Sequence, residues 1–127
     1  MKIKNVVWDW NGTIVDDAWV FVDVMNGLLK KNNLPTISTS DYKKHFCFPI
    51  QDYWHFLGFR FSKSEFNTLN FRFIKKYQKK IFLPKIHFGI KDVLTKLNDF
   101  KIKQFVLSAS EQNLLNKSVK HYNLNYL

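Results

Sequence analysis

The stretch that decides the fold lies near the N-terminus and reads Val6-Val7-Trp8-Asp9-Trp10-Asn11-Gly12-Thr13-Ile14-Val15-Asp16-Asp17. Residues 3–8 form an apolar run with two polar interruptions, which predicts a short buried strand. Asp9 follows this strand directly, and Gly12 then permits a sharp turn. Because open α/β sheets bind ligands just beyond the carboxyl ends of their strands, Asp9 lies where a functional side chain is expected. The alternative is a structural strand followed by a solvated carboxylate and a glycine turn.

The composition is that of a globular protein. The 127 residues are enough for one domain with a core, and 46% are hydrophobic and 17% aromatic, which excludes a disordered chain. No apolar run reaches the roughly 18 residues of a membrane-spanning helix, and residues 1–5 do not resemble a signal peptide. The single cysteine, Cys47, cannot form an internal disulfide and is expected to be a small buried hydrophobic residue. We therefore expect a cytoplasmic protein without a membrane partner.

The chain is strongly basic, with 20 Lys and Arg against 10 Asp and Glu and a formal net charge of +10. This charge indicates an anionic partner, either a phosphorylated metabolite or a nucleic acid, unless it only reflects a Lys-rich composition. Lysine runs such as Lys75-Lys76 and Lys79-Lys80 are typical of solvated helix faces. Because no recognised nucleic-acid-binding motif accompanies them, we do not favour binding to nucleic acid.

Residues 16–80 predict helices without a convincing strand. A helical pattern begins at Asp16 and ends near Lys31, with Asp16 and Asp17 in its first turn, where acids favour the helix dipole. Ser38 to Asp41 predicts a helix N-cap, and residues 49–57 predict another short helix. Ser62-Lys63-Ser64-Glu65 is a capping box, which predicts a long helix to about Lys80.

A second strand is predicted over residues 102–108, after a helix that Gly89 opens. This strand ends in a hydroxyl group, that of Ser108, and Ser110 is expected to cap a helix from Glu111 to about Tyr122. A long crossover joins the two predicted strands, so they should be parallel neighbours. Asp9 and Ser108 would then meet at one edge of the sheet.

Asp9-Trp10-Asn11-Gly12-Thr13 resembles the first motif of the haloacid dehalogenase-like superfamily, whose phosphatases read Asp-x-Asp-Gly-Thr after a buried strand. The match holds at Asp9, Gly12 and Thr13 and departs at Asn11, where the usual phosphatase has a second Asp. The apolar strand that ends in Ser108 resembles the second motif of the superfamily. Together the two motifs, in this order and across a helical insertion, identify the chain as similar to the phosphatase members.

The resemblance implies an α/β fold with a Rossmann-like core and an inserted helical cap. The core would comprise residues 1–15 and 82–127, and the cap residues 16–81. The resemblance covers about the first half of the chain usual in this superfamily, since a Lys and an acidic pair would follow beyond Leu127. Two parallel strands make a marginal sheet. We therefore expect either a truncated sequence or a partner that completes the sheet.

The resemblance also assigns roles in a candidate site. Asp9 would be the nucleophile that forms an aspartyl-phosphate, and Asn11 and Ser108 would complete the catalytic set. Mg²⁺, a hard cation that prefers oxygen ligands, would be held by the Asp9 carboxylate and the Asn11 backbone carbonyl. The phosphoryl group would be bound by Gly12, Thr13, Ser108 and Ala109.

These assignments predict a Mg²⁺-dependent, phosphoglycolate-phosphatase-like hydrolase for a small phosphorylated metabolite. Asn11 has no proton to exchange at neutral pH, and general acid–base help contributes about 10²–10⁴-fold. We therefore expect a slower enzyme, or one whose leaving group needs little help. The alternatives are a non-catalytic remnant with a binding or scaffold role, which Asn11 favours, and a basic nucleic-acid-binding helical protein, which only the charge favours.

Overall fold

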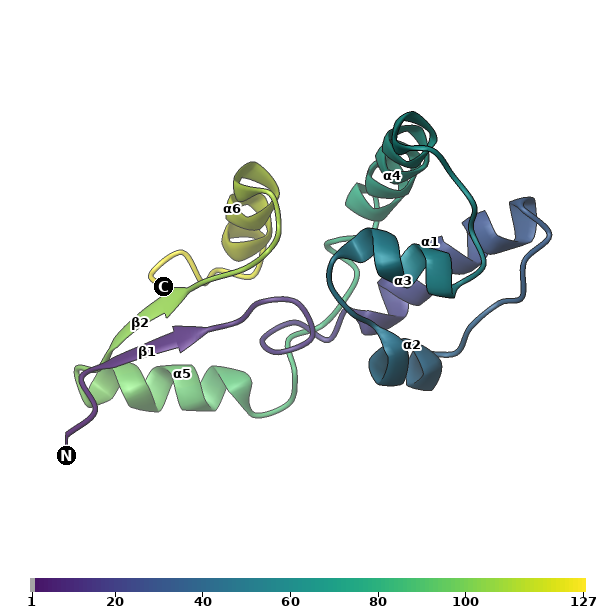
Figure 1. Ribbon diagram of the computed structural model, residues 1–127. Coiled ribbons are helices and arrows are strands. Elements are labelled where there is room, and N and C mark those ends of the chain that lie inside the picture. Colours follow the sequence, from purple (N-terminus) through teal and green to yellow (C-terminus); the bar gives the residue numbers. More distant parts are fainter. Residues whose placement is uncertain (1) are drawn as a thin grey trace. The chain divides into compact units, whose positions relative to one another are not determined.

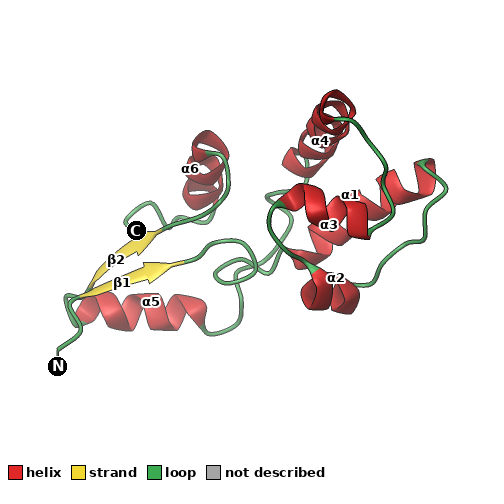
Figure 2. Ribbon diagram, viewed as in Figure 1, coloured by secondary structure: helices red, strands yellow, loops and turns green. Residues whose placement is uncertain are grey.

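A computed structural model describes residues 2–127 of the chain (Figure 1). The chain divides into two compact units, one formed by Met1–Asp17 and Ile81–Leu127 and the other by Ala18–Lys80. The first unit is mixed α/β and the second is helical (Figure 2). The α/β class predicted from the sequence is confirmed. Across residues 2–127, no helix combines the length and the apolar character that crossing a membrane requires.

The first unit contains a two-stranded parallel sheet. Strand β1, Asn5–Trp8, pairs with β2, Lys103–Val106, in a register that places Asn5 beside Lys103 and Trp8 beside Val106. Helices α5, Ile90–Asp99, and α6, Gln112–His121, complete this unit. The predicted parallel pairing is confirmed. The strands are shorter than the predicted ranges 3–8 and 102–108, although backbone bonds from Lys103 N to the Lys4 carbonyl and from Leu107 N to the Trp8 carbonyl extend the pairing at each end.

The core of the first unit is built around Trp10, whose side chain is 2% exposed. Its indole N–H donates to Ser118 Oγ on α6 at 3.1 Å. A second link crosses the sheet, since Trp8 Nε1 donates to Gln104 Oε1 at 3.0 Å and Gln104 Nε2 donates to the carbonyl of Leu94 at 2.9 Å. The buried members of this core are Trp10, Ile14, Val15, Leu94, Leu115 and Leu124.

One face of the sheet is apolar and exposed. Val7 on β1 and Phe105 on β2 are 62% and 49% exposed, whereas Gln104, on the opposite face of β2, is buried. Side chains alternate between the two faces of a strand, so α5 and the loop around Trp10 cover one face only. Parallel sheets are normally covered on both faces, and this one departs from that rule among the described residues.

The second unit packs four helices around an aromatic core. Its helices are α1, Ala18–Lys31; α2, Thr39–His45; α3, Ile50–Phe56; and α4, Lys63–Gln78. The core centres on Tyr53 and Trp54, each 1% exposed, which contact further aromatic rings. Most of the aromatic side chains in this region therefore serve packing, although Trp19, Phe48, Phe56 and Phe71 are exposed.

The N-cap predicted at Ser38 and the capping box predicted at Ser62 are confirmed, and Ser38 also forms a capping box, with Asp41. Ser38 caps α2, and Ser62 caps α4 through a reciprocal pair in which Ser62 Oγ accepts from Glu65 N and Glu65 Oε2 accepts from Ser62 N. Each pair satisfies two backbone N–H groups that a helix start leaves unbonded.

Helix α4 ends at Gln78, in agreement with the expected end near Lys80, whereas two other local expectations were wrong. Helix α1 begins at Ala18 rather than at Asp16, because the Asp17 carboxylate turns back and accepts from the Gly12 N–H. Cys47 is exposed rather than buried, since the connection between α2 and α3 leaves its side chain at the surface.

Two phenylalanines on α4 test the packing of the second unit. Phe73 is 6% exposed and contacts Phe21 and Trp54, whereas Phe71, two residues earlier, is 61% exposed. We expect Phe73→Ala to lower the free energy of unfolding by about 3–5 kcal/mol. The matched control Phe71→Ala should change it by about 0.5 kcal/mol or less. Urea unfolding followed by circular dichroism measures both values, and equal losses would contradict this description of the core.

Candidate active site

The candidate site lies at the carboxyl ends of β1 and β2. Asp9 follows the last residue of β1, and Ser108 comes two residues after the end of β2. The N–H of Leu107 donates to the carbonyl of Trp8 at 2.9 Å, which holds the two strand ends side by side. The polar residues that follow each strand therefore meet at this edge of the sheet.

The loop after β1 is shaped by the burial of Trp10. The carbonyl of Trp10 accepts backbone N–H groups from Thr13, Ile14 and Val15, at 3.3, 3.0 and 3.1 Å. Gly12 within this turn has φ +74°, a left-handed conformation that favours glycine. With Trp10 and Ile14 directed into the core, the residues between them lie at the rim of the site.

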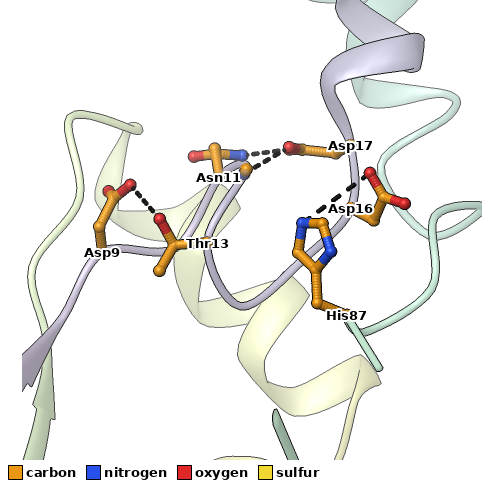
Figure 3. Close-up of polar contacts among 7 residues, drawn as sticks. Asp9, Asn11, Thr13, Asp16, Asp17 and His87 are labelled. Carbon is orange, nitrogen blue, oxygen red and sulfur yellow. Dashed lines mark hydrogen bonds and ion pairs between the residues drawn. The ribbon is translucent and has the colours of Figure 1, made fainter. Parts of the chain in front are cut away.

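Asp9 is exposed and partly fixed by its own loop. Thr13 Oγ1 donates to Asp9 Oδ2 at 2.9 Å (Figure 3). Because this bond holds one carboxylate oxygen, the side chain is oriented while it remains accessible to solvent. The predicted pair of Asp9 and Thr13 is therefore brought together.

The side chain of Asn11 makes hydrogen bonds to three other residues of the site. Its Nδ2 donates to Asp17 Oδ2 at 2.5 Å, as Figure 3 shows. On the other side, Asn11 Oδ1 accepts from Ser110 Oγ at 2.7 Å and from Ser108 Oγ at 3.3 Å. The amide thus joins the loop after β1 to the loop after β2. Ala109 lies between these two serines in the chain and offers its backbone only.

Asp17 was not assigned to the site from the sequence, yet it is one of its most buried polar residues. Its side chain is 6% exposed, and its Oδ1 accepts from the Gly12 N–H at 2.8 Å. The same N–H also donates to the carbonyl of Val15 at 2.9 Å. Gly12 therefore shapes the turn, while its N–H is bonded within the chain. No local pattern marked Asp17, since an acid at that position is also typical of a helix start.

Ser110 was predicted to cap α6, and this prediction was wrong. Glu111 is the N-cap, and its carboxylate accepts from the N–H groups of Asn113 and Leu114 at 3.0 and 2.9 Å. A carboxylate one residue further on satisfies these donors, so the Ser110 hydroxyl is available to bond Asn11. The N–H of Ser110 donates to Ser108 Oγ at 3.1 Å, which also fixes the predicted phosphoryl-binding hydroxyl.

The segment that returns from the helical unit borders the site. Asp16 Oδ1 lies 3.8 Å from His87 Nε2, and this contact becomes an ion pair when His87 is protonated (Figure 3). Tyr122 OH donates to the carbonyl of Pro84 at 2.6 Å. Burial, followed by the charge of Asp17, raises the pKa of the Tyr122 phenol. Backbone bonds from Asp16 N to the Lys85 carbonyl and from His87 N to the Ile14 carbonyl, both 2.9 Å, hold residues 84–87 against the loop that carries Asp16 and Asp17.

The family of the chain follows from its sequence as a whole. The profile of the haloacid dehalogenase-like hydrolases matches residues 6–127. The chain therefore belongs to the haloacid dehalogenase-like hydrolase family, as its two motifs indicated. No curated protein sequence gives a significant match.

Solved structures of similar fold agree with this membership. A predicted phosphoglycolate phosphatase from Haemophilus somnus superposes on 99% of the chain with a TM-score of 0.80 and 16% identity. A haloacid dehalogenase hydrolase of family IA, variant 3, from Entamoeba histolytica covers 97% of the chain, with a TM-score of 0.76 and 17% identity. A predicted phosphatase from Clostridium acetobutylicum covers 98%, with a TM-score of 0.73 and 20% identity.

The chain is shorter than these proteins. It spans 60%, 56% and 58% of their respective lengths. At such identities the likeness shows the fold, which in this chain is partial relative to the complete structures.

The Glu111 cap gives a pH-dependent prediction. Its bonds to the N–H groups of Asn113 and Leu114 lower the pKa of the Glu111 carboxyl from its ordinary 4.5. A lowered pKa stabilises the fold above the unfolded value, and this stabilisation disappears as the pH falls through the folded value. We therefore expect Glu111→Gln to melt below the wild type at pH 7, with the difference shrinking as the pH falls below 4.5 and through the lowered pKa of the folded state. Thermal unfolding from pH 3 to 7 checks this, and a difference independent of pH would contradict it.

Proposed function

We propose that this chain carries the nucleophile of a phosphatase-like hydrolase that acts on a small phosphorylated metabolite. The observation that carries the proposal is the position of Asp9, exposed at the carboxyl end of β1 and oriented by Thr13. On the adjoining strand end, the hydroxyls of Ser108 and Ser110 converge on Asn11. A carboxylate and two hydroxyls that face one edge of a sheet suit a phosphoryl group, which needs one nucleophile and several donors.

In the proposed reaction, an Asp9 carboxylate oxygen attacks phosphorus and the bond to the ester oxygen of the substrate breaks. This step forms an aspartyl-phosphate and releases an alcohol, whose oxygen takes a proton from solvent or from the metabolite itself. Water then attacks phosphorus and the bond between phosphorus and the Asp9 oxygen breaks. The Asp9 carboxylate is regenerated, inorganic phosphate is released, and the proton of the attacking water passes to the phosphate or to solvent. On binding of the substrate, the Thr13 hydroxyl would turn from Asp9 and the Ser108 hydroxyl from Asn11, so that each donates its one hydrogen to a phosphoryl oxygen. Backbone N–H groups near Ala109 would add further donors.

Asn11 limits this chemistry. Its amide has no proton to transfer, so it orients neighbouring groups rather than acting as an acid or base. General acid–base help contributes about 10²–10⁴-fold in enzymes that use it. The proposed enzyme is therefore best suited to substrates with good leaving groups, and it should be slow on alkyl phosphates.

Magnesium is the proposed cofactor. Mg²⁺ is commonly held by one or two protein oxygens together with water and substrate phosphate, and the Asp9 carboxylate and Asn11 carbonyl fit that donor set. Among residues 2–127, no cluster of three or more His, Cys, Asp or Glu side chains could hold a metal. The bound ion would neutralise charge on the phosphoryl oxygens. Asp9 would then need its second oxygen for attack, which its single bond to Thr13 permits.

The domain roles and the substrate class belong to the same proposal. Residues 1–15 and 82–127 would form the Rossmann-like core, and residues 16–81 the cap that selects the substrate. The predicted phosphoglycolate phosphatase among the similar structures supports a small phosphorylated acid as one candidate substrate. A single cysteine in the sequence is compatible with the cytoplasmic setting expected above.

A second candidate is a non-catalytic member of the family with a binding or scaffold role. Asn11 supports it, because the amide is engaged with Asp17, Ser108 and Ser110 and replaces the usual acid. Turnover separates the two candidates. A folded chain that binds phosphate but never forms a phosphorylated protein would support the second one.

The nucleophile is tested with an aryl phosphate, whose leaving group needs little protonation. With Mg²⁺ present, we expect Asp9→Asn to lower the rate of hydrolysis by roughly 10³-fold or more. The matched control is Asp92→Asn, which removes an exposed carboxylate of α5 in the same unit and should leave the rate unchanged. Mass spectrometry of the acid-quenched wild type should detect one added phosphoryl group at Asp9. Hydrolysis that survives in Asp9→Asn would rule out the proposed mechanism.

A further inference from the structure

We infer that Asp17 is a positioning residue, which fixes the Asn11 amide and, through that amide, the hydroxyls of Ser108 and Ser110. The link to turnover rests on the proposed function, whereas the pairing of Asn11 with Asp17 stands on the hydrogen bonds alone. Asn11 and Asp17 form one unit, in which the negative charge is carried at position 17 and the hydrogen-bond donor at position 11.

Both carboxylate oxygens of Asp17 are committed to the loop after β1. Oδ2 accepts from Asn11 Nδ2 at 2.5 Å, and Oδ1 accepts from the Gly12 N–H at 2.8 Å. The side chain is 6% exposed. Hydrogen bonds to a charged acceptor are about twice as strong as neutral ones, so this carboxylate is well suited to hold the loop.

The carboxylate also decides which way the Asn11 amide faces. An ionised carboxylate only accepts hydrogen bonds, so the amide must turn its NH₂ group towards Asp17. Its oxygen then faces β2, where it accepts from Ser110 Oγ at 2.7 Å and Ser108 Oγ at 3.3 Å. Without Asp17 the amide could rotate, and both hydroxyls would lose a fixed acceptor. Asp17 therefore orients the two serine hydroxyls indirectly, through the Asn11 amide.

The pair explains why the usual aspartate of the family is absent at position 11. Two carboxylates in the present geometry would bring two acceptor oxygens together, with no hydrogen between them. Such a like-charge contact in a buried place is strongly unfavourable. This geometry therefore favours one carboxylate and one amide at positions 11 and 17 over two ionised carboxylates.

Exchanging the two residues should preserve the network. In Asn11→Asp/Asp17→Asn, the new amide at 17 donates to the new carboxylate at 11, while its oxygen still accepts from the Gly12 N–H. The carboxylate at 11 still accepts from Ser108 and Ser110. Asn and Asp have nearly the same shape, so the exchange reverses the polarity of one hydrogen bond and retains the rest.

A double-mutant cycle tests the pairing without measuring turnover. We expect Asn11→Asp to reduce the folding equilibrium constant by about tenfold to a hundredfold near pH 8, from the unfavourable energy of an unsatisfied buried group. The exchanged double variant should regain most of this loss in urea unfolding. Losses from the two single variants that simply add in the double variant would overturn the inference. If Asn11→Asp alone does not fold but the double variant does, the rescue supports the pairing directly.

Nuclear magnetic resonance of the Asn11 side chain reports directly on the orientation of its amide. A general loss of stability in a variant that remains folded would not change this signal. In the wild type, the two NH₂ protons should have separate shifts and slowed exchange with solvent. Asp17→Ala should move them to solvent-like values, whereas the neighbouring control Asp16→Asn should leave them in place. In the exchanged variant, the protected NH₂ should belong to Asn at position 17. An Asn11 signal that is unchanged in folded Asp17→Ala would overturn the inference.

The two proposals can fail separately. Coupling between positions 11 and 17 together with no phosphorylation of Asp9 would uphold the pairing and reject the phosphatase mechanism. Phosphorylation of Asp9, together with additive stability losses in the double-mutant cycle and an unchanged Asn11 signal in Asp17→Ala, would uphold the phosphatase mechanism and reject the pairing.

Discussion

The burial of Trp10 is the constraint on which the candidate site depends. Its indole fills the core of the α/β unit and donates to Ser118 on α6, while its carbonyl accepts three backbone N–H groups of the following turn. A buried side chain of this size fixes the backbone on either side of it. Asp9 and Asn11, the two neighbours of Trp10, are therefore presented at the rim on a rigid support. The polar residues of the candidate site are thus positioned by a buried tryptophan that does not itself lie among them.

The parts of this arrangement that the sequence could predict are those that depend on local order along the chain. The strand before Asp9, the strand before Ser108 and their parallel pairing follow from apolar runs and from the long crossover between them. The N-cap at Ser38 follows from residue type, and the capping box at Ser62 follows from its spacing to Glu65. Asp9 could be singled out because it combines a strand end with a glycine turn.

The parts that could not be predicted depend on competition between residues for the same partners. Ser110 and Glu111 are both able to cap α6, and only the structure shows that Glu111 does so while Ser110 bonds Asn11. Asp17 could stabilise a helix start or turn back to the Gly12 N–H, and it does the latter. Because such choices depend on three-dimensional proximity, no pattern along the chain distinguishes them.

The uncovered face of the sheet has a consequence for how this chain behaves at high concentration. Ile3, Val7, Phe105 and Leu107 are 49–72% exposed, on or beside strands that have one neighbour each. Apolar side chains next to unpaired backbone groups favour the addition of further strands from other molecules. Self-association should therefore begin at the sheet rather than at the helical unit, and a charged residue in place of Val7 would be a sensible first change for keeping preparations dispersed.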